Sequence, residues 1–430
     1  MSPKEQASPP NSQVVGTVQR SHSGKRNRIV PAEGEKAKLL ETLRLIDRGG
    51  MTIACDCVVS KGAIMLRKTP LHAAHSQAGA KFTDFAGFEM PVEYESQISE
   101  HRAVRSGAGI FDLSHMAEIF CEGAEVESFL DYSLSNKLSV LQNSQAKYSL
   151  LLAADGGVID DLIVYRLEPK RFLLVANAAN RDVAFETLSE RAKGFEVSVS
   201  DQSDQWALIA VQGPKASEIL RLSPLTLGVE LGELGYYWLT DGKFGDEELL
   251  VARTGYTGED GFEILVKAHA AELLWSALLN VGGEGPTLCG LASRDTLRLE
   301  AGMPLYGQEL SLNVSPAQAG LSWVVNNSKG KFVGQDVALE SKSSRVLTGL
   351  VAEGKRAPRA GYSVLDSQEI RIGEISSGAL SPSLGYPIAM AYIEEEFVQP
   401  GTQLMVDVRG AKLPVNVHPL PFYSRKKAVQ

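Results

Sequence analysis

The sequence has few cysteines and no long apolar run, and both absences restrict what the chain can be. Its 430 residues include only four cysteines, which are too few and too scattered for a disulfide framework. Cys55 and Cys57 lack the second pair or the nearby histidines that would complete a zinc site, so we expect no metal. No stretch approaches the roughly 18 consecutive apolar residues of a membrane span. We therefore predict a protein that does not cross a membrane and holds no disulfide framework.

Several common catalytic and nucleotide-binding motifs are also missing. The sequence contains no G-x-x-x-x-G-K-[ST], no H-E-x-x-H and no G-x-S-x-G before a helix. The glycine-rich stretch 255–261 leads into a strand-forming run rather than the helix that a phosphate cradle requires. These absences argue against a P-loop nucleotidase, a zinc protease and an α/β-hydrolase.

The charge balance argues against a general nucleic-acid binder. The chain has 43 Lys and Arg against 52 Asp and Glu, a net charge of −9, whereas such binders are usually basic. The N-terminus lacks a secretory signal, and it carries acidic residues that a mitochondrial transit peptide tends to avoid. We expect a cytoplasmic, monomeric protein without nucleic-acid or membrane partners. The acidic residues of the N-terminus are Glu5, Glu33, Glu35, Glu41 and Asp47.

Composition divides the chain into three regions. Residues 1–65 are dominated at first by Ser, Pro, Asn and Gln, and we predict a largely disordered extension with one possible helix at 33–48. Residues 66–340 mix short β-rich runs with amphipathic helices, which indicates an α+β body of two interleaved subdomains. Residues 345–424 consist of short strands between glycine and proline turns, which favours a C-terminal β-barrel.

Apolar runs and helical periodicity locate several elements of the body. The runs are bounded by Gly, Pro or Asp, as strands usually are. The helical candidates show apolar residues at helical spacing. We predict strands at 171–178, 206–213, 248–253 and 261–266, and helices at 181–195, with Gly194 as its stop, and 214–222.

Two adjacent acids, Asp160 and Asp161, begin a strand-forming run. Neighbouring residues of a strand point to opposite faces, so the two carboxylates cannot act as one pair on a common substrate. One should point into the fold or a cleft and the other away from it. An acid beside an apolar strand is costly unless it is hydrogen-bonded or functional, although a turn Asp next to an exposed Asp would also fit the pattern.

Other charges interrupt apolar periodicity, and tyrosines gather near the same turns. Glu263, Arg294 and Arg298 could be either structural ion pairs or ligand contacts. His115 lacks a candidate nucleophile, so we expect a structural histidine. A carboxylate, an arginine and several flat rings together would suit a planar polar heterocycle. The tyrosines are Tyr148, Tyr165, Tyr236, Tyr237 and Tyr256.

A series of segments in order resembles one family. They include TPLHAAH, DFAGFEMPVEY, GIFDLSHM, KYSLLLAADGGVIDDLIVY, VANAAN, RTGYTGEDGFEI, GLASRDTLRLEAGMPLYGQEL and GEISSGALSPSLG. The sequence is identified by these motifs as similar to the aminomethyltransferase (T-protein) family of the glycine cleavage system. The resemblance runs from about Arg67 to Tyr423, and residues before Met65 lie outside it.

The resemblance implies a three-domain fold around a folate channel and a tetrahydrofolate-dependent reaction. The expected enzyme takes the aminomethyl group from the lipoyl arm of the H-protein, releases ammonia and forms 5,10-methylenetetrahydrofolate. Asp161 takes the position of the catalytic aspartate. The positions that the resemblance assigns to folate are Glu263, Arg294, Tyr148, Tyr165, Asn177, Tyr256 and Tyr423, with Arg425 as an alternative to the last.

Related folate proteins with other activities remain as alternatives. A relative that assists iron–sulfur cluster maturation carries Lys-Gly-Cys-Tyr-x-Gly-Gln, whereas this chain has Lys331 in place of the cysteine within 329–335. A folate-linked demethylase of the sarcosine type would join a flavin-binding module, and no dinucleotide fingerprint is present. A third alternative, a protein that only binds and scaffolds, is disfavoured by the intact Asp161.

Overall fold

The computed structural model describes residues 65–425. The predicted disordered extension up to Ile64, its helix at 33–48, and Cys55 and Cys57 lie outside the described residues. Within residues 65–425, no helix is long and apolar enough to cross a membrane.

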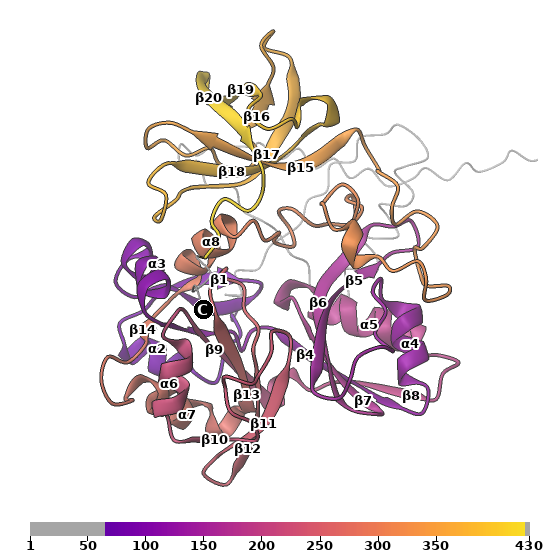
Figure 1. Ribbon diagram of the computed structural model, residues 1–430, viewed down its shortest axis with the longest axis vertical. Helices are drawn as coiled ribbons and strands as arrows, with labels where there is room; N and C mark the ends of the chain where they lie inside the picture. Colours follow the sequence, from indigo (N-terminus) through magenta and orange to yellow (C-terminus); the bar gives the residue numbers. More distant parts are fainter. Residues whose placement is uncertain (1–64, 426–430) are drawn as a thin grey trace, which may run out of the picture. The chain divides into compact units, whose positions relative to one another are not determined.

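One sheet of the body has seven strands in the order β10-β11-β12-β13-β9-β3-β14 (Figure 1). Its neighbours pair antiparallel except for β14 and β3. On one face, the apolar side chains pack against α6 (Ala216–Leu222) and α7 (Ala271–Leu279). The strands are β3 (Gly109–Asp112), β9 (Trp206–Gln212), β10 (Leu225–Leu227), β11 (Leu239–Phe244), β12 (Glu247–Ala252), β13 (Gly261–Lys267) and β14 (Thr287–Leu288).

A second sheet of the body has five antiparallel strands in the order β5-β6-β7-β4-β8. The helices α4 (Val126–Ser133) and α5 (Arg181–Arg191) cover one of its faces (Figure 1). The strands are β4 (Ala117–Gly123), β5 (Gln145–Leu152), β6 (Val158–Glu168), β7 (Arg171–Ala176) and β8 (Val197–Asp201).

The two sheets share an apolar layer between their other faces. Phe120 and Leu173 of the five-stranded sheet are buried in one cluster with Leu208 and Leu265 of the seven-stranded sheet. Because side chains alternate along a strand, residues two positions from these also face the layer. The layer therefore receives polar side chains from both sheets wherever the apolar pattern is interrupted.

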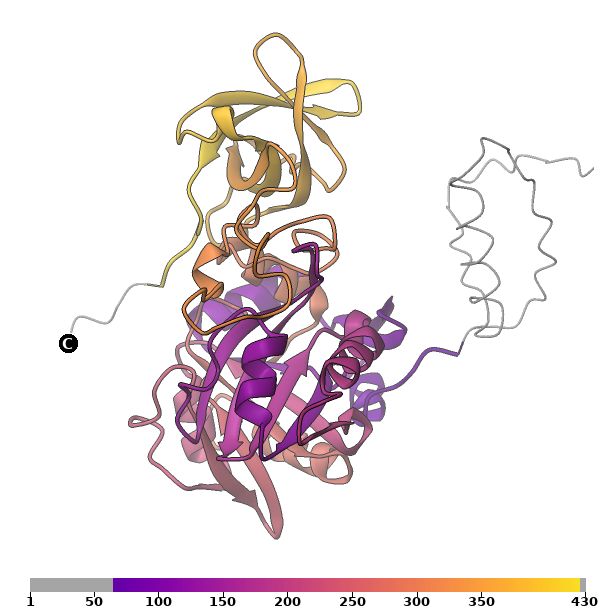
Figure 2. The ribbon, with the colours of Figure 1, turned by 90° about the vertical axis from the view of Figure 1, so that its right-hand side faces the viewer.

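The C-terminal region is a closed six-stranded barrel, as the sequence predicts (Figure 2). The ring closes where β15 pairs with β20, with Gly349 opposite His418. A side chain at Gly349 would lie 2.6 Å from the His418 carbonyl oxygen, so the close approach requires glycine. The strands are β15 (Arg345–Ala352), β16 (Ser363–Leu365), β17 (Arg371–Leu380), β18 (Pro387–Glu394), β19 (Gln403–Val408) and β20 (Ala411–His418).

Shorter elements complete the body, and α8 (Leu291–Glu300) links it to the barrel. Leu299 of α8 packs with Ile388 and Met390 of β18. The helix α3 (Gln97–Ser106) is capped by the Ser96 side chain, which accepts from the Ser99 amide. The others are α2 (His72–Gln77), β1 (Lys81–Phe85), β2 (Phe88–Glu93), and the 3₁₀ turns η1 (Ala178–Asn180), η2 (Ser203–Gln205), η3 (Ala268–Ala270), η4 (Ser322–Val324) and η5 (Glu395–Phe397).

The predicted α+β class and the predicted strands and helices are confirmed, with small differences in length. The apolar runs become β7, β9, β12 and β13. The helix predicted at 181–195 ends at Arg191, three residues before its expected stop at Gly194. Gly194 has a φ of +98°, so it supports the turn that follows the helix.

Candidate active site

Asp161 is held in a fixed position by two side chains, one from the neighbouring strand β5 and one from the turn after β7. Its Oδ2 accepts a hydrogen bond from the Tyr148 hydroxyl at 3.0 Å, and its Oδ1 accepts from Asn177 Nδ2 at 2.9 Å. Tyr148 is on β5, and Asn177 lies between β7 and η1. Burial raises the pKa of Asp161 above its ordinary value, whereas the two hydrogen bonds lower it. Three of the predicted site residues are therefore in direct contact.

Asp160 lies on the opposite, helix-covered face of β6 and is fully buried. This confirms the predicted alternation of the two acids. Asp160 accepts from the Asn177 amide at 3.1 Å, Asn177 Nδ2 at 2.8 Å and Asn180 Nδ2 at 2.6 Å. Burial raises the pKa of Asp160, and the charge of Asp161 raises it further. The two acids therefore share Asn177 although they face different layers.

Glu263 enters the layer between the two sheets from β13. Its Oε2 accepts from the Thr254 hydroxyl at 2.5 Å and from the Tyr165 hydroxyl at 3.5 Å. All three side chains are buried. Tyr165 comes from β6 of the other sheet, so this contact joins the sheets through a polar cluster. A small cavity of about 20 Å³ lies beside Tyr165 and Glu263.

Arg294 extends from α8 towards the same cluster and keeps an unused hydrogen-bond donor. Its Cζ lies 4.9 Å from the ring centroid of Tyr256. Its Nη1 is buried and has no hydrogen-bond partner within residues 65–425. The Tyr256 hydroxyl donates to the Pro304 carbonyl oxygen, which fixes the ring. A buried guanidinium nitrogen without a partner is costly, and this indicates a place for an acceptor from a ligand.

Burial and nearby charges shift the pKa values of both Arg294 and Tyr256. Burial lowers the pKa of Arg294, whereas the charges of Glu263 and Tyr256 raise it. Burial raises the pKa of Tyr256, Arg298 lowers it, and Asp161 raises it again. Two charged groups shift each other's pKa appreciably only when they lie close together. Tyr256 therefore lies near Asp161 and Arg294, and Arg294 lies near Glu263, whereas the common site that the sequence predicts for these residues stays a prediction.

Two further residues, Tyr237 and His115, lie near these charges. Tyr237 has a φ of +59°, an uncommon conformation for a tyrosine, and its carbonyl oxygen accepts from the Ala146 amide of β5 at 2.6 Å. Burial raises the pKa of Tyr237, and Glu263 raises it further. His115 is buried, and its Nδ1 has no partner among the described residues. Burial lowers its pKa to about 4, although the charge of Asp112 raises it, and Arg294 adds to the lowering. The sequence predicts Tyr237 as part of the tyrosine cluster, but neither its position in the sequence nor the family resemblance assigns it a contact with a ligand.

The remaining candidate residues, Tyr423, Arg425 and Arg298, contact residues other than Asp161. Tyr423 donates to Glu259 Oε1 at 2.8 Å, and its ring lies 3.9 Å from Arg105 Cζ. Arg425 lies over the Tyr236 ring at 4.7 Å. Arg298 forms the structural ion pair that the sequence left open, with Glu309 Oε2 at 2.9 Å. These contacts of Tyr423 and Arg425 do not include Asp161, and the contact of every candidate residue with folate stays a prediction.

The residues around Asp161 can be compared with those of known proteins. Residues 71–329 match the family model of the GCVT N-terminal domain, and residues 345–424 match that of the glycine cleavage T-protein C-terminal barrel domain. The chain belongs to the glycine cleavage T-protein family.

The match between this chain and curated members of the T-protein family extends over nearly the whole length of those proteins. An aminomethyltransferase of Cutibacterium acnes is 52% identical over 369 residues, which are 84% of this chain and 99% of that protein. One of Streptomyces coelicolor is 49% identical over 371 residues, with 84% and 99% covered. The crystal structure of a glycine cleavage system aminomethyltransferase from Bartonella henselae aligns with a TM-score of 0.78 and 38% identity, covering 83% of this chain and 98% of that chain. The resemblance read from the motifs is thus confirmed, and the chain is an aminomethyltransferase.

Proposed function

We propose that this T-protein transfers the carbon of an aminomethyl group from the lipoylated H-protein to tetrahydrofolate, with release of ammonia, and that it works in the cytoplasm. The observation that carries the proposal is the position of Asp161. Its carboxylate is fixed by Tyr148 and Asn177, and its charge raises the pKa of Tyr256, the ring that Arg294 contacts. Two relatives that are 49% and 52% identical to this chain bear the name aminomethyltransferase.

Asp161 would act on the carbon from which ammonia departs. That carbon becomes cationic and iminium-like as the bond to nitrogen breaks, and a fixed negative charge stabilises it more than the ground state. The hydrogen bonds from Tyr148 and Asn177 hold the carboxylate in one orientation. Because burial raises the pKa of Asp161, the group is also a stronger base than an exposed aspartate and is suited to accept a proton.

The polar cluster has the chemistry needed to hold a folate. The buried Nη1 of Arg294, which has no partner among the described residues, would donate to a carbonyl or carboxylate of the ligand. Glu263 offers acceptor oxygens to the donor edge of a pterin, and the rings of Tyr165 and Tyr256 offer flat walls. When bound, tetrahydrofolate supplies the amine that receives the carbon. Among residues 65–425, no group of three His, Cys, Asp or Glu side chains is arranged to hold a metal ion.

No specific observation favours the alternative functions that related folate proteins have. Lys331 is exposed and stands where the iron–sulfur relatives have a cysteine, so no thiol is available at that position. The curated relatives that cover 84% of the chain carry the aminomethyltransferase name rather than that of a demethylase.

Calorimetric titration with tetrahydrofolate tests the ligand of the polar cluster. Glu263→Gln keeps the size of the side chain but replaces an acceptor-only carboxylate with an amide, which leaves part of the pterin donor edge unpaired. We expect a cost of about 1–3 kcal/mol, equivalent to an affinity roughly 5- to 150-fold lower. Absence of binding by the wild type, or unchanged affinity in Glu263→Gln, would reject the site.

A further inference from the structure

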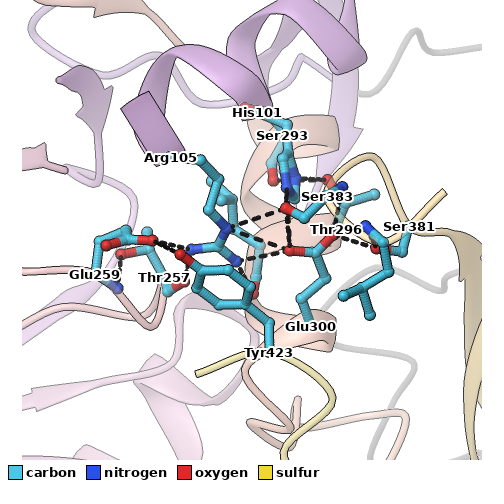
Figure 3. Close-up of polar contacts among 12 residues, drawn as sticks. His101, Arg105, Thr257, Glu259, Ser293, Thr296, Glu300, Ser381, Ser383 and Tyr423 are labelled. Carbon is cyan, nitrogen blue, oxygen red and sulfur yellow. Dashed lines mark hydrogen bonds and ion pairs between the residues drawn. The ribbon is translucent and has the colours of Figure 1, made fainter. Parts of the chain in front are cut away.

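One part-buried arginine of α3 contacts two segments that are distant in sequence. Arg105 Nη1 donates to the Thr257 carbonyl oxygen at 2.7 Å and to Glu259 Oε1 at 3.0 Å. Its Nη2 donates to Glu300 Oε2 at 2.9 Å and to the Leu297 carbonyl oxygen at 3.4 Å. Figure 3 shows the guanidinium between Glu259 and Glu300. Its side chain is only 9% exposed, so these contacts form with little competition from water.

Both acidic partners of Arg105 also contact the C-terminal region. Glu300 Oε2 accepts from the Ser383 hydroxyl at 2.7 Å, and its Oε1 accepts from the Ser383 amide at 3.0 Å. Ser383 follows β17 of the barrel. Glu259 accepts from Tyr423, whose ring stacks on the Arg105 guanidinium (Figure 3). The arginine is therefore the common partner of the body and the barrel at this junction.

The two body segments that Arg105 holds are the ones that carry site residues. Thr257 directly follows Tyr256 in the loop between β12 and β13. Glu300 and Arg294 are both on α8. Tyr256 and Arg294 are also the two members of the cation–π pair in the site. A shift of the guanidinium would displace the loop relative to the helix and would separate this pair.

We propose that Arg105 is a positioning residue for the folate site, and that through it the packing of the barrel sets the distance between Tyr256 and Arg294. The inference rests on the proposed function, because folate is the ligand whose binding would sense that distance. Arg105 itself does not touch the reacting atoms. Its planar fork of donors matches two carboxylates and two carbonyl oxygens at once, which a lysine cannot reproduce.

Arg105→Lys tests the proposal, with Arg191→Lys as the matched control. Arg191 is a part-buried arginine of α5 that donates to the carbonyl oxygens of Ser133 and Leu152, outside the junction. Each variant would be measured well below its melting temperature for tetrahydrofolate affinity, KM and kcat. We expect Arg105→Lys to remain folded and to lose about 10-fold or more in affinity and in kcat/KM, because a misplacement of about 1 Å can cost on the order of 100-fold. Arg191→Lys should retain both values.

Two further variants distinguish positioning from general stability. Ser383→Ala leaves every body contact of Arg105 in place and removes the barrel hydroxyl that contacts Arg105, His101 and Glu300. We expect a smaller loss of folate affinity in the same direction. The effects of Arg105→Lys and Tyr256→Phe on affinity should be non-additive, because both act through one loop. Normal folate affinity in a folded Arg105→Lys would overturn the inference. If that variant does not fold, normal folate affinity in Ser383→Ala would overturn it instead. Strictly additive effects of Arg105→Lys and Tyr256→Phe on affinity would also overturn it. Failure of the wild type to bind folate would instead reject the proposed function.

Discussion

The catalytic proposal depends on the protonation state of one carboxyl group. Asp161 must be ionised to stabilise a cationic carbon, and burial raises its pKa above the ordinary value of 3.8. The fraction of active enzyme should therefore fall on acidification at a higher pH than for an exposed aspartate.

We predict that kcat/KM decreases as the pH falls through the raised pKa of Asp161, with an acid limb well above pH 4. Asp161→Asn should keep the fold and bind folate but lose activity on the order of 100-fold or more, because one preorganised charge is removed. The measurement is a pH–rate profile of both proteins. A variant with near-normal turnover, or a wild-type profile without an acid limb above pH 5, would contradict the assigned role.

A second buried carboxyl group has no hydrogen-bond partner in the part of the chain that the structure describes. Glu118 on β4 is fully buried, and both of its side-chain oxygens are unpartnered there. Burial raises the pKa of Glu118 well above 4.5. The folded chain therefore binds this proton more tightly than the unfolded chain, and its contribution to stability is present below the unfolded pKa and is lost as the pH rises through the folded pKa.

Glu118→Gln should make stability less dependent on pH. The wild type is expected to lose up to about 1.4 kcal/mol of unfolding free energy per pH unit above pH 4.5, up to the folded pKa. The glutamine side chain of the variant does not titrate, so the unfolding free energy of the variant should change less over the same interval. Urea unfolding between pH 5 and pH 9, at about one-unit steps, measures both slopes. Parallel slopes in the two proteins would show that the pKa of Glu118 is not raised in the folded state.

At the scale of elements, the strand β6 and the turn after β7 position the site together. Asp160 holds the backbone and side chain of Asn177 and the side chain of Asn180, so the acid on the covered face fixes the amide that binds Asp161. Alternation along the strand predicts that Asp160 is remote from the chemistry. The shared asparagine instead makes it a support of the site.

Asp160→Asn should therefore reduce activity more than its position on the covered face suggests. The added amide N–H groups would oppose the existing donors of Asn177 and Asn180, at a cost of about 1–3 kcal/mol. We expect a loss in kcat of about 10-fold or more, intermediate between the wild type and Asp161→Asn. Steady-state kinetics and thermal unfolding of the same preparation give both quantities. Activity equal to the wild type would show that Asn177 does not need Asp160.

The sequence predicts the elements of this protein better than the contacts between them. The apolar runs at β7, β9 and β13 are recognisable because both faces of these strands are buried. The alternation in β6 correctly separates Asp160 from Asp161. Contacts such as that of Arg105 with Glu300 join residues 195 positions apart, and no local spacing encodes them.

The family resemblance, rather than the periodicity of the sequence, predicts that these residues form one site. The carboxylate, arginine and tyrosines are each ambiguous alone, because ion pairs such as Arg298 with Glu309 give the same pattern. Tyr237 could not be assigned because its place depends on a left-handed backbone conformation and on a contact between two sheets.

At the scale of the whole molecule, the residues before Met65 lie outside the family match. The beginning of this segment, which is rich in Ser, Pro, Asn and Gln, offers few apolar residues that could pack against the body. We predict that deletion of residues 1–64 leaves the melting temperature and the activity nearly unchanged. Thermal unfolding and turnover of the shortened chain would measure this, and a decrease of more than a few degrees would show that the extension packs.

Reconstituted transfer is the most direct test of the central claim. The purified chain would be mixed with tetrahydrofolate and H-protein that carries the aminomethyl group on its lipoyl arm, and both ammonia and methylene-folate would be measured over time. The proposed mechanism predicts equal amounts of the two products from the wild type and almost none from Asp161→Asn. Folate binding without transfer by the wild type, or equal turnover by Asp161→Asn, would contradict it.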